Sequence, residues 1–217
     1  MKSLLSFFNW LHSALFPLKC LVCRKEGLVL CQRHQWLPPA IVPPLTKFKY
    51  LDGLYAVSDY SNPSAKALVH WLKFYRHRAP VITMAEHLQE KVPWQQWPRA
   101  VIMPLPLHWW RRHQRGFNQS TLLARRVAEF LEAPYDENSF KRVKITRQQA
   151  RLSKLERRKN MDNAFAWTAQ GPPPETVILI DDVCTTGETL QAAAKTLKKA
   201  GAKKVIGVVF AYQSLND

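Results

Sequence analysis

Three apolar runs without alternation constrain the fold of this 217-residue chain more than any other feature. The runs are AVIMPLP at 100–106, VILI at 177–180 and VIGVVF at 205–210. A strand that is apolar at successive positions has both faces buried, which is typical of a parallel sheet covered by helices on its two sides. Capping and turn residues predict helices between the runs, over 118–131 and 186–200. The pattern therefore predicts an α/β fold with a parallel sheet.

A proline-rich stretch divides the chain into two parts. Two proline pairs lie within residues 38–44, and prolines at this density break regular structure. We therefore expect an N-terminal module at 1–47 and a main domain at 48–217. In the main domain, LYAVSDY at 54–60 predicts a further strand, and Pro63 marks the start of the next helix.

The first residues, MKSLLSFFNWLHSALFP, predict an amphipathic helix that docks on the chain itself or lies on a membrane surface. Asn9 and His12 interrupt the apolar run, and no cleavage site of small residues follows, which disfavours a signal peptide. No run approaches the ~18 apolar residues of a membrane span. We therefore expect a cytoplasmic protein without a transmembrane segment. The apolar positions at helical spacing are Leu4, Phe8, Leu11 and Leu15.

The charge of the chain is strongly positive. It has 32 Lys and Arg residues against 16 Asp and Glu, a formal net charge of +16. A field of this sign attracts polyanions such as nucleic acid, phosphorylated small molecules or anionic lipid. A basic but ordinary enzyme is the alternative. The hydrophobic fraction of 47% is sufficient for a folded core and disfavours global disorder.

The basic residues concentrate in the segment 141–165, which we expect to be irregular and too polar for the core. Residues 141–159 contain nine Lys or Arg and one acid, a net charge of +8. Residues 109–112 place two tryptophans directly before two arginines. Stacking aromatics combined with phosphate-neutralising cations hold single strands without sequence preference. The alternative is a tryptophan in the core and a solvated basic face. The nucleic-acid candidates are Trp109, Trp110, Arg111, Arg112, Arg147, Arg151, Lys154 and Arg158.

Two adjacent carboxylates, Asp181 and Asp182, follow the apolar run at 177–180. Ligands of open parallel sheets bind at the carboxyl ends of strands, and the exposed amides of a following helix bind phosphate. Carboxylates beside a phosphate site fit a ligand that also presents vicinal hydroxyls or a magnesium ion. Ribose 5-phosphate has this chemistry. The phosphate loop at 183–189 contributes Thr185, Thr186, Gly187 and Thr189.

Three cysteines and a histidine form two pairs, Cys20-x2-Cys23 and Cys31-x2-His34. Tetrahedral Zn²⁺ takes such a Cys₃His set readily. A redox-active Cys-x-x-Cys pair and simple packing of the cysteines remain as alternatives.

Four segments resemble known families. VILIDDVCTTGET at 177–189 is similar to the phosphoribosyl-pyrophosphate (PRPP) signature of the type I phosphoribosyltransferases. PLPLHWWRRHQRGFNQ at 104–119, QARLSKLERRKNMDNAF at 149–165 and ALFPLKCLVC at 14–23 resemble segments of the ComF family of competence proteins. The resemblance implies a type I phosphoribosyltransferase-like parallel sheet flanked by helices, with a small N-terminal zinc-binding module.

The resemblance also implies roles for individual residues. Leu105 and Pro106 stand where the family has its pyrophosphate loop, and 142–165 stands where type I enzymes have a flexible lid. Arg115 and Arg157 match the family pattern and are candidate anion contacts and catalytic residues, because guanidinium groups suit phosphates. Mg²⁺ would accompany PRPP. The residues that would bind PRPP are Asp181, Asp182, Thr185, Thr186, Gly187 and Thr189.

The family resemblance implies a protein that handles incoming single-stranded DNA in natural transformation, with DNA-uptake proteins as partners. Two alternatives are an active phosphoribosyltransferase with an unknown acceptor and a non-catalytic PRPP sensor. Thr185 stands where some purine-salvage enzymes have an aspartate that assists the nucleobase, so the sequence leaves catalysis open. His34 replaces the last cysteine of the usual family metal site. Cys184 is expected to pack as a small hydrophobic residue, with a reactive thiol as the alternative.

Overall fold

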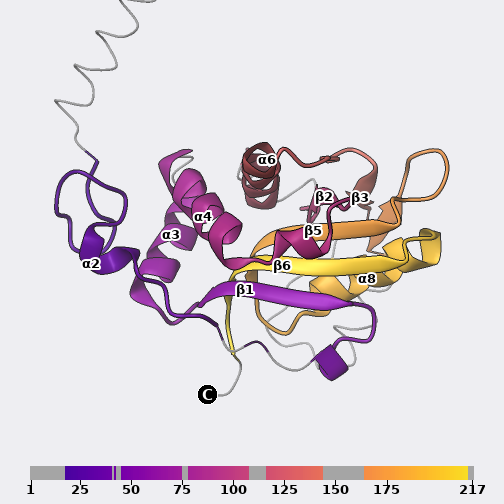
Figure 1. Cartoon of the computed structure of the whole chain (residues 1–217), viewed down its shortest axis with the longest axis horizontal. Coiled ribbons are helices and arrows are strands. Elements are labelled where there is room, and N and C mark those ends of the chain that lie inside the picture. The colour runs from indigo at the N-terminus through magenta and orange to yellow at the C-terminus, as the bar shows by residue number, and fades with distance from the viewer. Residues whose placement is uncertain are drawn as a thin grey trace, which may run out of the picture.

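A four-stranded parallel sheet forms the centre of the protein, with the strand order β1-β6-β5-β2 (Figure 1). The computed structural model describes residues 18–40, 42, 45–74, 78–107, 116–143 and 164–214. The strands are β1 (Gly53–Asp59), β2 (Val101–Pro104), β5 (Thr176–Cys184) and β6 (Lys204–Tyr212). β2, β5 and β6 contain or overlap the three predicted apolar runs, and β1 overlaps the further strand predicted at 54–60. The predicted parallel sheet is confirmed.

The central strand β5 has both faces buried, as its apolar run predicts. Ile178 and Ile180 belong to the core beneath one helical layer, whereas Val177 and Leu179 belong to the core beneath the other. All four side chains are at most 2% exposed. Every residue of the run therefore contributes apolar burial, and a polar substitution at any of them would face a dry core.

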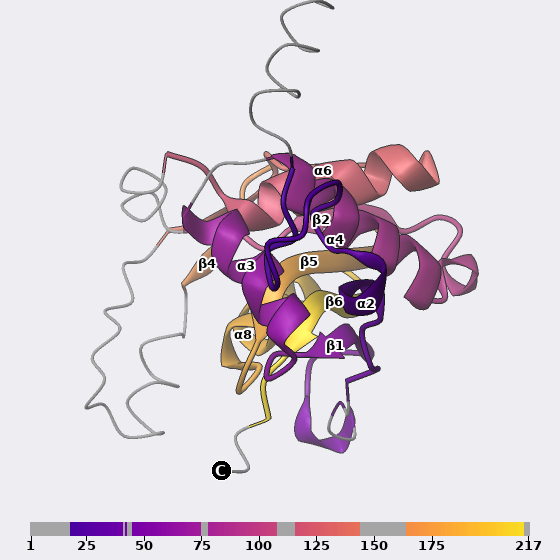
Figure 2. The ribbon, with the colours of Figure 1, turned by 90° about the vertical axis from the view of Figure 1, so that its left-hand side faces the viewer.

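Helices cover both faces of the sheet (Figures 1 and 2). One face carries α3 (Pro63–Phe74), α4 (Arg78–Lys91) and α6 (Gln119–Leu131), and the other carries α8 (Glu188–Ala200). The α4 helix was not predicted. Its buried positions repeat at helical spacing, and this is the signal that would have indicated it. These positions are Val81, Met84, Ala85 and Leu88.

Side-chain caps begin two of these helices at the predicted positions. The Asn62 side chain accepts hydrogen bonds from the backbone N–H groups of Ser64 and Ala65, at 2.9 and 3.1 Å. The Asn118 side chain accepts one from the Ser120 N–H at 3.2 Å. An asparagine at this position satisfies amides that the first turn leaves unpaired, so both helix starts are fixed locally by sequence.

A short antiparallel pair, β3 (Phe140–Arg142) with β4 (Phe165–Trp167), packs beside α8. The rings of Phe140 and Phe165 stack with centroids 5.4 Å apart, and both are buried. The expectation that 141–165 is irregular was therefore wrong at both ends, which lie in strands. The expectation that it is excluded from the core was wrong at its carboxyl end, where Ala164 and Phe165 are buried. Aromatic residues flank the basic stretch and bury their rings there, while 144–163 lies outside the described residues.

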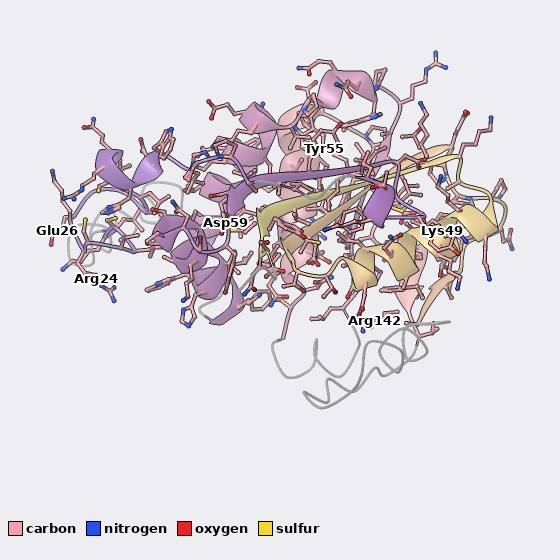
Figure 3. All side chains as sticks on the ribbon, turned by 90° about the horizontal axis from the view of Figure 1, so that it is seen from below. Arg24, Glu26, Lys49, Tyr55, Asp59 and Arg142 are labelled. Carbon is pink, nitrogen blue, oxygen red and sulfur yellow. The ribbon has the colours of Figure 1, made fainter. Side chains whose placement is uncertain are left out.

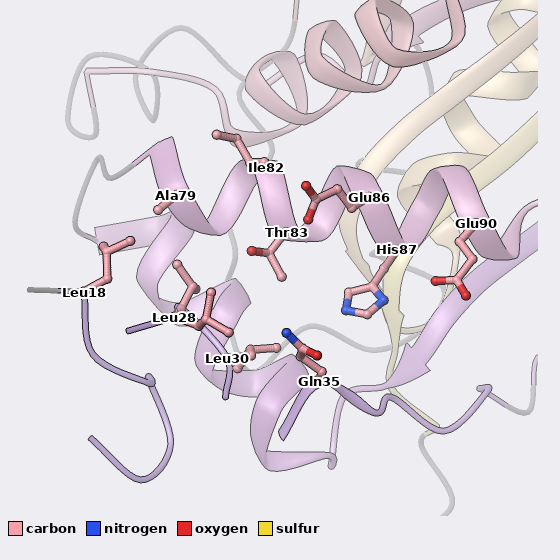
Figure 4. Close-up of a pocket in the computed structure, with 11 residues that line it drawn as sticks. Leu18, Leu28, Leu30, Gln35, Ala79, Ile82, Thr83, Glu86, His87 and Glu90 are labelled. Atoms are coloured by element: carbon pink, nitrogen blue, oxygen red, sulfur yellow. The ribbon is translucent and has the colours of Figure 1, made fainter. Parts of the chain in front are cut away.

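The N-terminal cysteine module packs against α3 and α4. Its short helix α2 (Gln32–Gln35) is followed by Leu37, which is 1% exposed and joins the same core as those helices. Lys91 of α4 donates a hydrogen bond to the Leu37 carbonyl. A groove of about 430 Å³ remains between the module and α4, with Leu18, Leu28 and His87 among its lining residues (Figure 4). The predicted boundary between residues 47 and 48 remains a prediction.

Two short 3-10 helices, η1 (Leu45–Lys47) and η2 (Trp94–Gln96), complete the described elements. The expected amphipathic helix at the N-terminus lies within 1–17, outside the described residues. Across the described part of the chain, no helix combines the length and the apolar character that crossing a bilayer requires.

Candidate functional site

The two aspartates lie at the carboxyl end of β5, just past the end of its neighbour β2. Pro104 is the last β2 residue and pairs with Ile180, the residue before Asp181. The chain then leaves the sheet at Leu105, whose N–H donates to the Ile180 carbonyl at 2.9 Å. Pairing of β5 with β6 continues as far as Cys184. The predicted pyrophosphate loop and the acidic pair are therefore neighbours at one edge of the sheet.

The strand is four residues longer than the predicted 177–180 at its carboxyl end, and Val183 and Cys184 belong to it and not to the phosphate loop. The cause is β6, which supplies a hydrogen-bonding partner along the whole of β5. Both aspartates therefore sit on regular, paired backbone. A site on a strand is positioned more rigidly than one on a loop.

The Asp181 carboxylate is held by the start of α6. Its Oδ1 accepts a hydrogen bond from the Ser120 hydroxyl at 2.7 Å and another from the Asp182 N–H at 2.9 Å. The Asn118 amide nitrogen donates to the Leu105 carbonyl at 3.1 Å. One helix end thus holds both Asp181 and the loop after β2. Ser120 was not singled out from the sequence, because its partner is 61 residues away and no local pattern indicates it.

The Asp182 carboxylate is buried and faces a cation. Its Oδ1 accepts a hydrogen bond from the Val183 N–H at 3.0 Å, and its Oδ2 lies 3.1 Å from Nζ of Lys73 in α3. The Asp182 residue is 8% exposed. Lys73 was also missed at the sequence level, because the two residues are far apart along the chain.

Burial and proximity set the protonation of the pair. Burial, and then the negative charge of Asp182, raise the pKa of Asp181 to about 8, although the Ser120 hydrogen bond opposes this shift. Near neutral pH the Asp181 carboxyl group consequently keeps its proton. A carboxyl and a carboxylate side by side can donate to and accept from hydroxyl groups, as a sugar diol requires.

The loop between β5 and α8 contains the predicted phosphate-binding residues. Thr185 is exposed, whereas the Thr186 hydroxyl accepts a hydrogen bond from the Glu188 N–H at 3.3 Å and so caps the start of α8. Thr189 lies in the first turn of that helix. The free amides and the dipole at the start of a 13-residue helix favour an anion here.

Gly187 is required by the fold itself. Its φ angle of +75° lies in the left-handed region, and an added Cβ would be 2.4 Å from Cε1 of Phe48. This glycine is among the phosphate-binding residues predicted from the sequence, and the structure adds a packing reason for it. Phe48 belongs to the N-terminal flank of the main domain and covers the loop directly.

Cys184 is a core residue. It is 3% exposed, and burial followed by the charge of Asp181 raises the pKa of its thiol to about 12. A thiol with this pKa stays protonated at neutral pH and is a poor nucleophile, so the alternative of a reactive cysteine is wrong.

The four predicted metal ligands come together in the N-terminal module. Their donor atoms all lie within 4.8 Å of one another. Cys23 Sγ is 3.7 Å from Cys31 Sγ, and Nδ1 of His34 is 3.5 Å from Cys20 Sγ and 3.2 Å from Cys31 Sγ. Tetrahedral zinc with its usual bond lengths requires edges of about 3.7 Å between sulfurs and about 3.5 Å between sulfur and nitrogen. The ligand set could therefore hold a metal ion, and its distances are consistent with zinc.

Local backbone structure brings the four candidate metal ligands together. The Arg24 N–H donates to the Cys20 carbonyl at 2.9 Å, which closes a tight turn around the first pair, and the second pair spans the start of α2. Figure 3 shows Arg24 and Glu26 at the end of this module that lies away from the sheet. Burial raises the pKa of Cys20, but backbone hydrogen bonds from Cys23 and Cys31 outweigh it and lower the pKa to about 6. A thiolate near neutral pH is the form that binds metal.

The candidate DNA and lid residues lie outside the described part of the chain, so their predictions stay untested. They fall within 108–115 and 144–163, and the first of these segments directly follows the loop after β2. The residues concerned are Trp109, Trp110, Arg111, Arg112, Arg115, Arg147, Arg151, Lys154, Arg157 and Arg158.

Comparison with known proteins agrees with this architecture. Residues 117–214 match the family model of the phosphoribosyl transferase domain, a range that contains Ser120, both aspartates and α8. The fold is thus of the phosphoribosyltransferase class. A solved purine phosphoribosyltransferase from Pyrococcus horikoshii Ot3 is 18% identical, with a TM-score of 0.37, over 62% of this chain and 82% of that one.

The curated relatives narrow this class to one family. Competence protein F of Haemophilus influenzae is 41% identical over 162 residues, which cover 71% of this chain and 70% of the relative. DNA utilization protein YhgH of Salmonella typhi is 37% identical over 161 residues, which cover 70% and 68%. The chain belongs to the competence protein F (ComF) family, and the predicted resemblance is confirmed.

Proposed function

We propose that this protein handles incoming single-stranded DNA in the cytoplasm during natural transformation and binds PRPP at the acidic pair of β5. Its relatives are named for competence and for DNA utilization, and its charge of +16 favours a polyanionic partner. The observation that carries the PRPP assignment is the placement of Asp181 and Asp182 between the Leu105 loop and the phosphate loop before α8.

In this proposal each part of PRPP has a matching group. The ribose hydroxyls contact Asp181 and Asp182, and the pyrophosphate lies against Leu105 and Pro106. Mg²⁺ would arrive with the pyrophosphate and neutralise its charge. The carboxyl groups suit this ligand because their oxygens lie at the carboxyl end of β5, between the two loops that would hold its phosphates. The 5-phosphate contacts Thr185, Thr186, Gly187 and Thr189.

The DNA proposal rests on the basic segment 141–159 and on the tryptophan–arginine segment 109–112. Single-strand affinity should fall with salt at a slope of roughly −0.7 per neutralised phosphate. Replacing Arg147, Arg151 and Arg158 with alanine should reduce both affinity and slope. Replacing the exposed lysines Lys203 and Lys204 at the start of β6 is the matched control and should change little. A salt-independent affinity would contradict the proposal.

A phosphoribosyl transfer reaction with an unidentified acceptor is the second candidate, favoured by the complete signature at 177–189. Arg115 and Arg157 are its catalytic candidates, and Thr185 offers no general base. Pyrophosphate release from PRPP and Mg²⁺ with candidate bases, lost in Asp182→Asn, would support it. Binding of PRPP without release for any acceptor would favour a sensor. Partners in either case would be proteins of DNA uptake.

The Cys20, Cys23, Cys31 and His34 cluster is proposed as a structural zinc site. Its ligand distances match tetrahedral zinc, and the module that it closes packs on the core through Leu37. Metal analysis of the purified protein should give one zinc per chain. A content well below one would contradict this assignment.

A further inference from the structure

Lys73 reaches the acidic pair from a separate helix. It lies in the last turn of α3, and its Nζ is 3.1 Å from Oδ2 of Asp182 at the end of β5. The side chains are only 25% and 11% exposed. Leu72, its neighbour on α3, is 1% exposed and anchors the helix in the core. The lysine is therefore held beside the carboxylate by packing and not by a chance surface encounter.

The contact between Lys73 and Asp182 is electrostatic and compensates the charge of the carboxylate. Asp182 Oδ2 is buried, and within the described residues it accepts no hydrogen bond, so Lys73 meets it through an ionic contact. The other oxygen, Oδ1, is already bonded to the Val183 N–H. Asp182 thus has one oxygen bonded to the backbone and the other beside a compensating positive charge.

A fixed cation changes what two adjacent carboxylates can bind. Without it, paired aspartates are the hard oxygen ligands that Mg²⁺ and Ca²⁺ prefer. A positive charge 3.1 Å from one of them repels a second cation, and burial strengthens the effect because the surroundings screen it less than water does. The same charge does not oppose a neutral hydroxyl, and it attracts a phosphate group.

We propose that Lys73 is a specificity-determining residue, which makes the Asp181–Asp182 pair an acceptor of sugar hydroxyls and prevents it from acting as a site for free divalent cations. The proposal rests on the proposed ribose-phosphate function of this pair. The residue that selects sugar hydroxyls over divalent cations would then lie in α3, a helix outside the signature at 177–189.

Two ligands measured separately by titration calorimetry on the full chain test the proposal, MgCl₂ alone and ribose 5-phosphate alone. Lys73→Met and Lys73→Gln should bind Mg²⁺ more tightly, on the order of tenfold, and ribose 5-phosphate more weakly by a similar factor. Lys73→Arg retains the charge and should resemble the unmodified protein in both titrations. Lys66→Met, at an exposed position of the same helix, is the matched control and should change neither.

Adding Asp182→Asn shows whether Lys73 acts through that carboxylate. In the Asp182→Asn background, Lys73→Gln should no longer alter Mg²⁺ affinity. An unchanged Mg²⁺ affinity in the single Lys73→Gln variant, or Mg²⁺ and sugar affinities that move in the same direction, would overturn the role of Lys73. Failure of the unmodified protein to bind ribose 5-phosphate would instead contradict the proposed function, and the Mg²⁺ titrations, which use no sugar, would still decide the role of Lys73.

Discussion

Replacing Gly187 with alanine separates the structural role of the signature glycine from its role toward ligand. The substitution places a side chain on a backbone with φ of +75° and a Cβ 2.4 Å from Cε1 of Phe48. The left-handed backbone costs about 1–2 kcal/mol, and overpacking against a buried ring adds about 1–3 kcal/mol. We therefore expect Gly187→Ala to lower the free energy of unfolding by about 2–5 kcal/mol, a large part of a typical domain's stability.

Gly171 provides a matched control because its φ is +78° and a Cβ added there would have no atom within 4 Å. Gly171→Ala should lose only the backbone part, about 1–2 kcal/mol. Urea unfolding followed by tryptophan fluorescence measures both variants, and Phe48→Leu in the Gly187→Ala background should recover part of the loss. Equal destabilisation of Gly187→Ala and Gly171→Ala would refute the packing argument.

Three further predictions concern the acidic pair and the metal centre. The folded-state pKa of Asp181, about 8, lies above its ordinary value of 3.8, so folded protein binds the extra proton and stability should fall as pH rises between these values. Asp181→Asn should remove this decline, and above pH 8 its melting temperature should exceed that of the unmodified protein. If the melting temperatures of the two proteins instead change with pH in parallel, the raised pKa of Asp181 is contradicted. Ser120→Ala should weaken ribose 5-phosphate binding, because a hydrogen bond to a carboxyl group, worth about 1–3 kcal/mol, is lost; unchanged affinity measured by calorimetry would argue against a positioning role. His34→Ala should lower zinc content and melting temperature together, while Cys184→Ala should lower only the melting temperature; normal zinc in His34→Ala would exclude it as a ligand.

The strands and caps of this fold are predictable because their causes are local. The run Val177–Ile180 is apolar at every position, and Asn118 and Asn62 cap the helices that follow them. The candidate metal ligands are equally local, since two short spacings define them. The acidic pair was identified because both residues are adjacent in sequence.

The residues that contact the acidic pair could not be predicted from the sequence, because they lie far from it along the chain. Ser120 and Lys73 reach β5 from two different helices, and only the packing of α6 and α3 on the sheet brings them there. The length of β5 was likewise underestimated, because its extension past Ile180 depends on pairing with β6. The strands at the two ends of 141–165 were missed because charge dominates the composition of this segment, whereas Phe165 stacks on Phe140, the residue just before the segment.

Thermal unfolding with and without PRPP and Mg²⁺ tests the central claim most directly. At a PRPP concentration about one hundred times the dissociation constant, binding to the folded state should add about 2.7 kcal/mol. For a chain of this size such a gain raises the melting temperature by several degrees. We predict this shift for the unmodified protein and its loss in Asp182→Asn. An equal shift in Asp182→Asn, or no shift in the unmodified protein at millimolar PRPP, would contradict the assignment of the β5 acidic pair as a ribose-phosphate site.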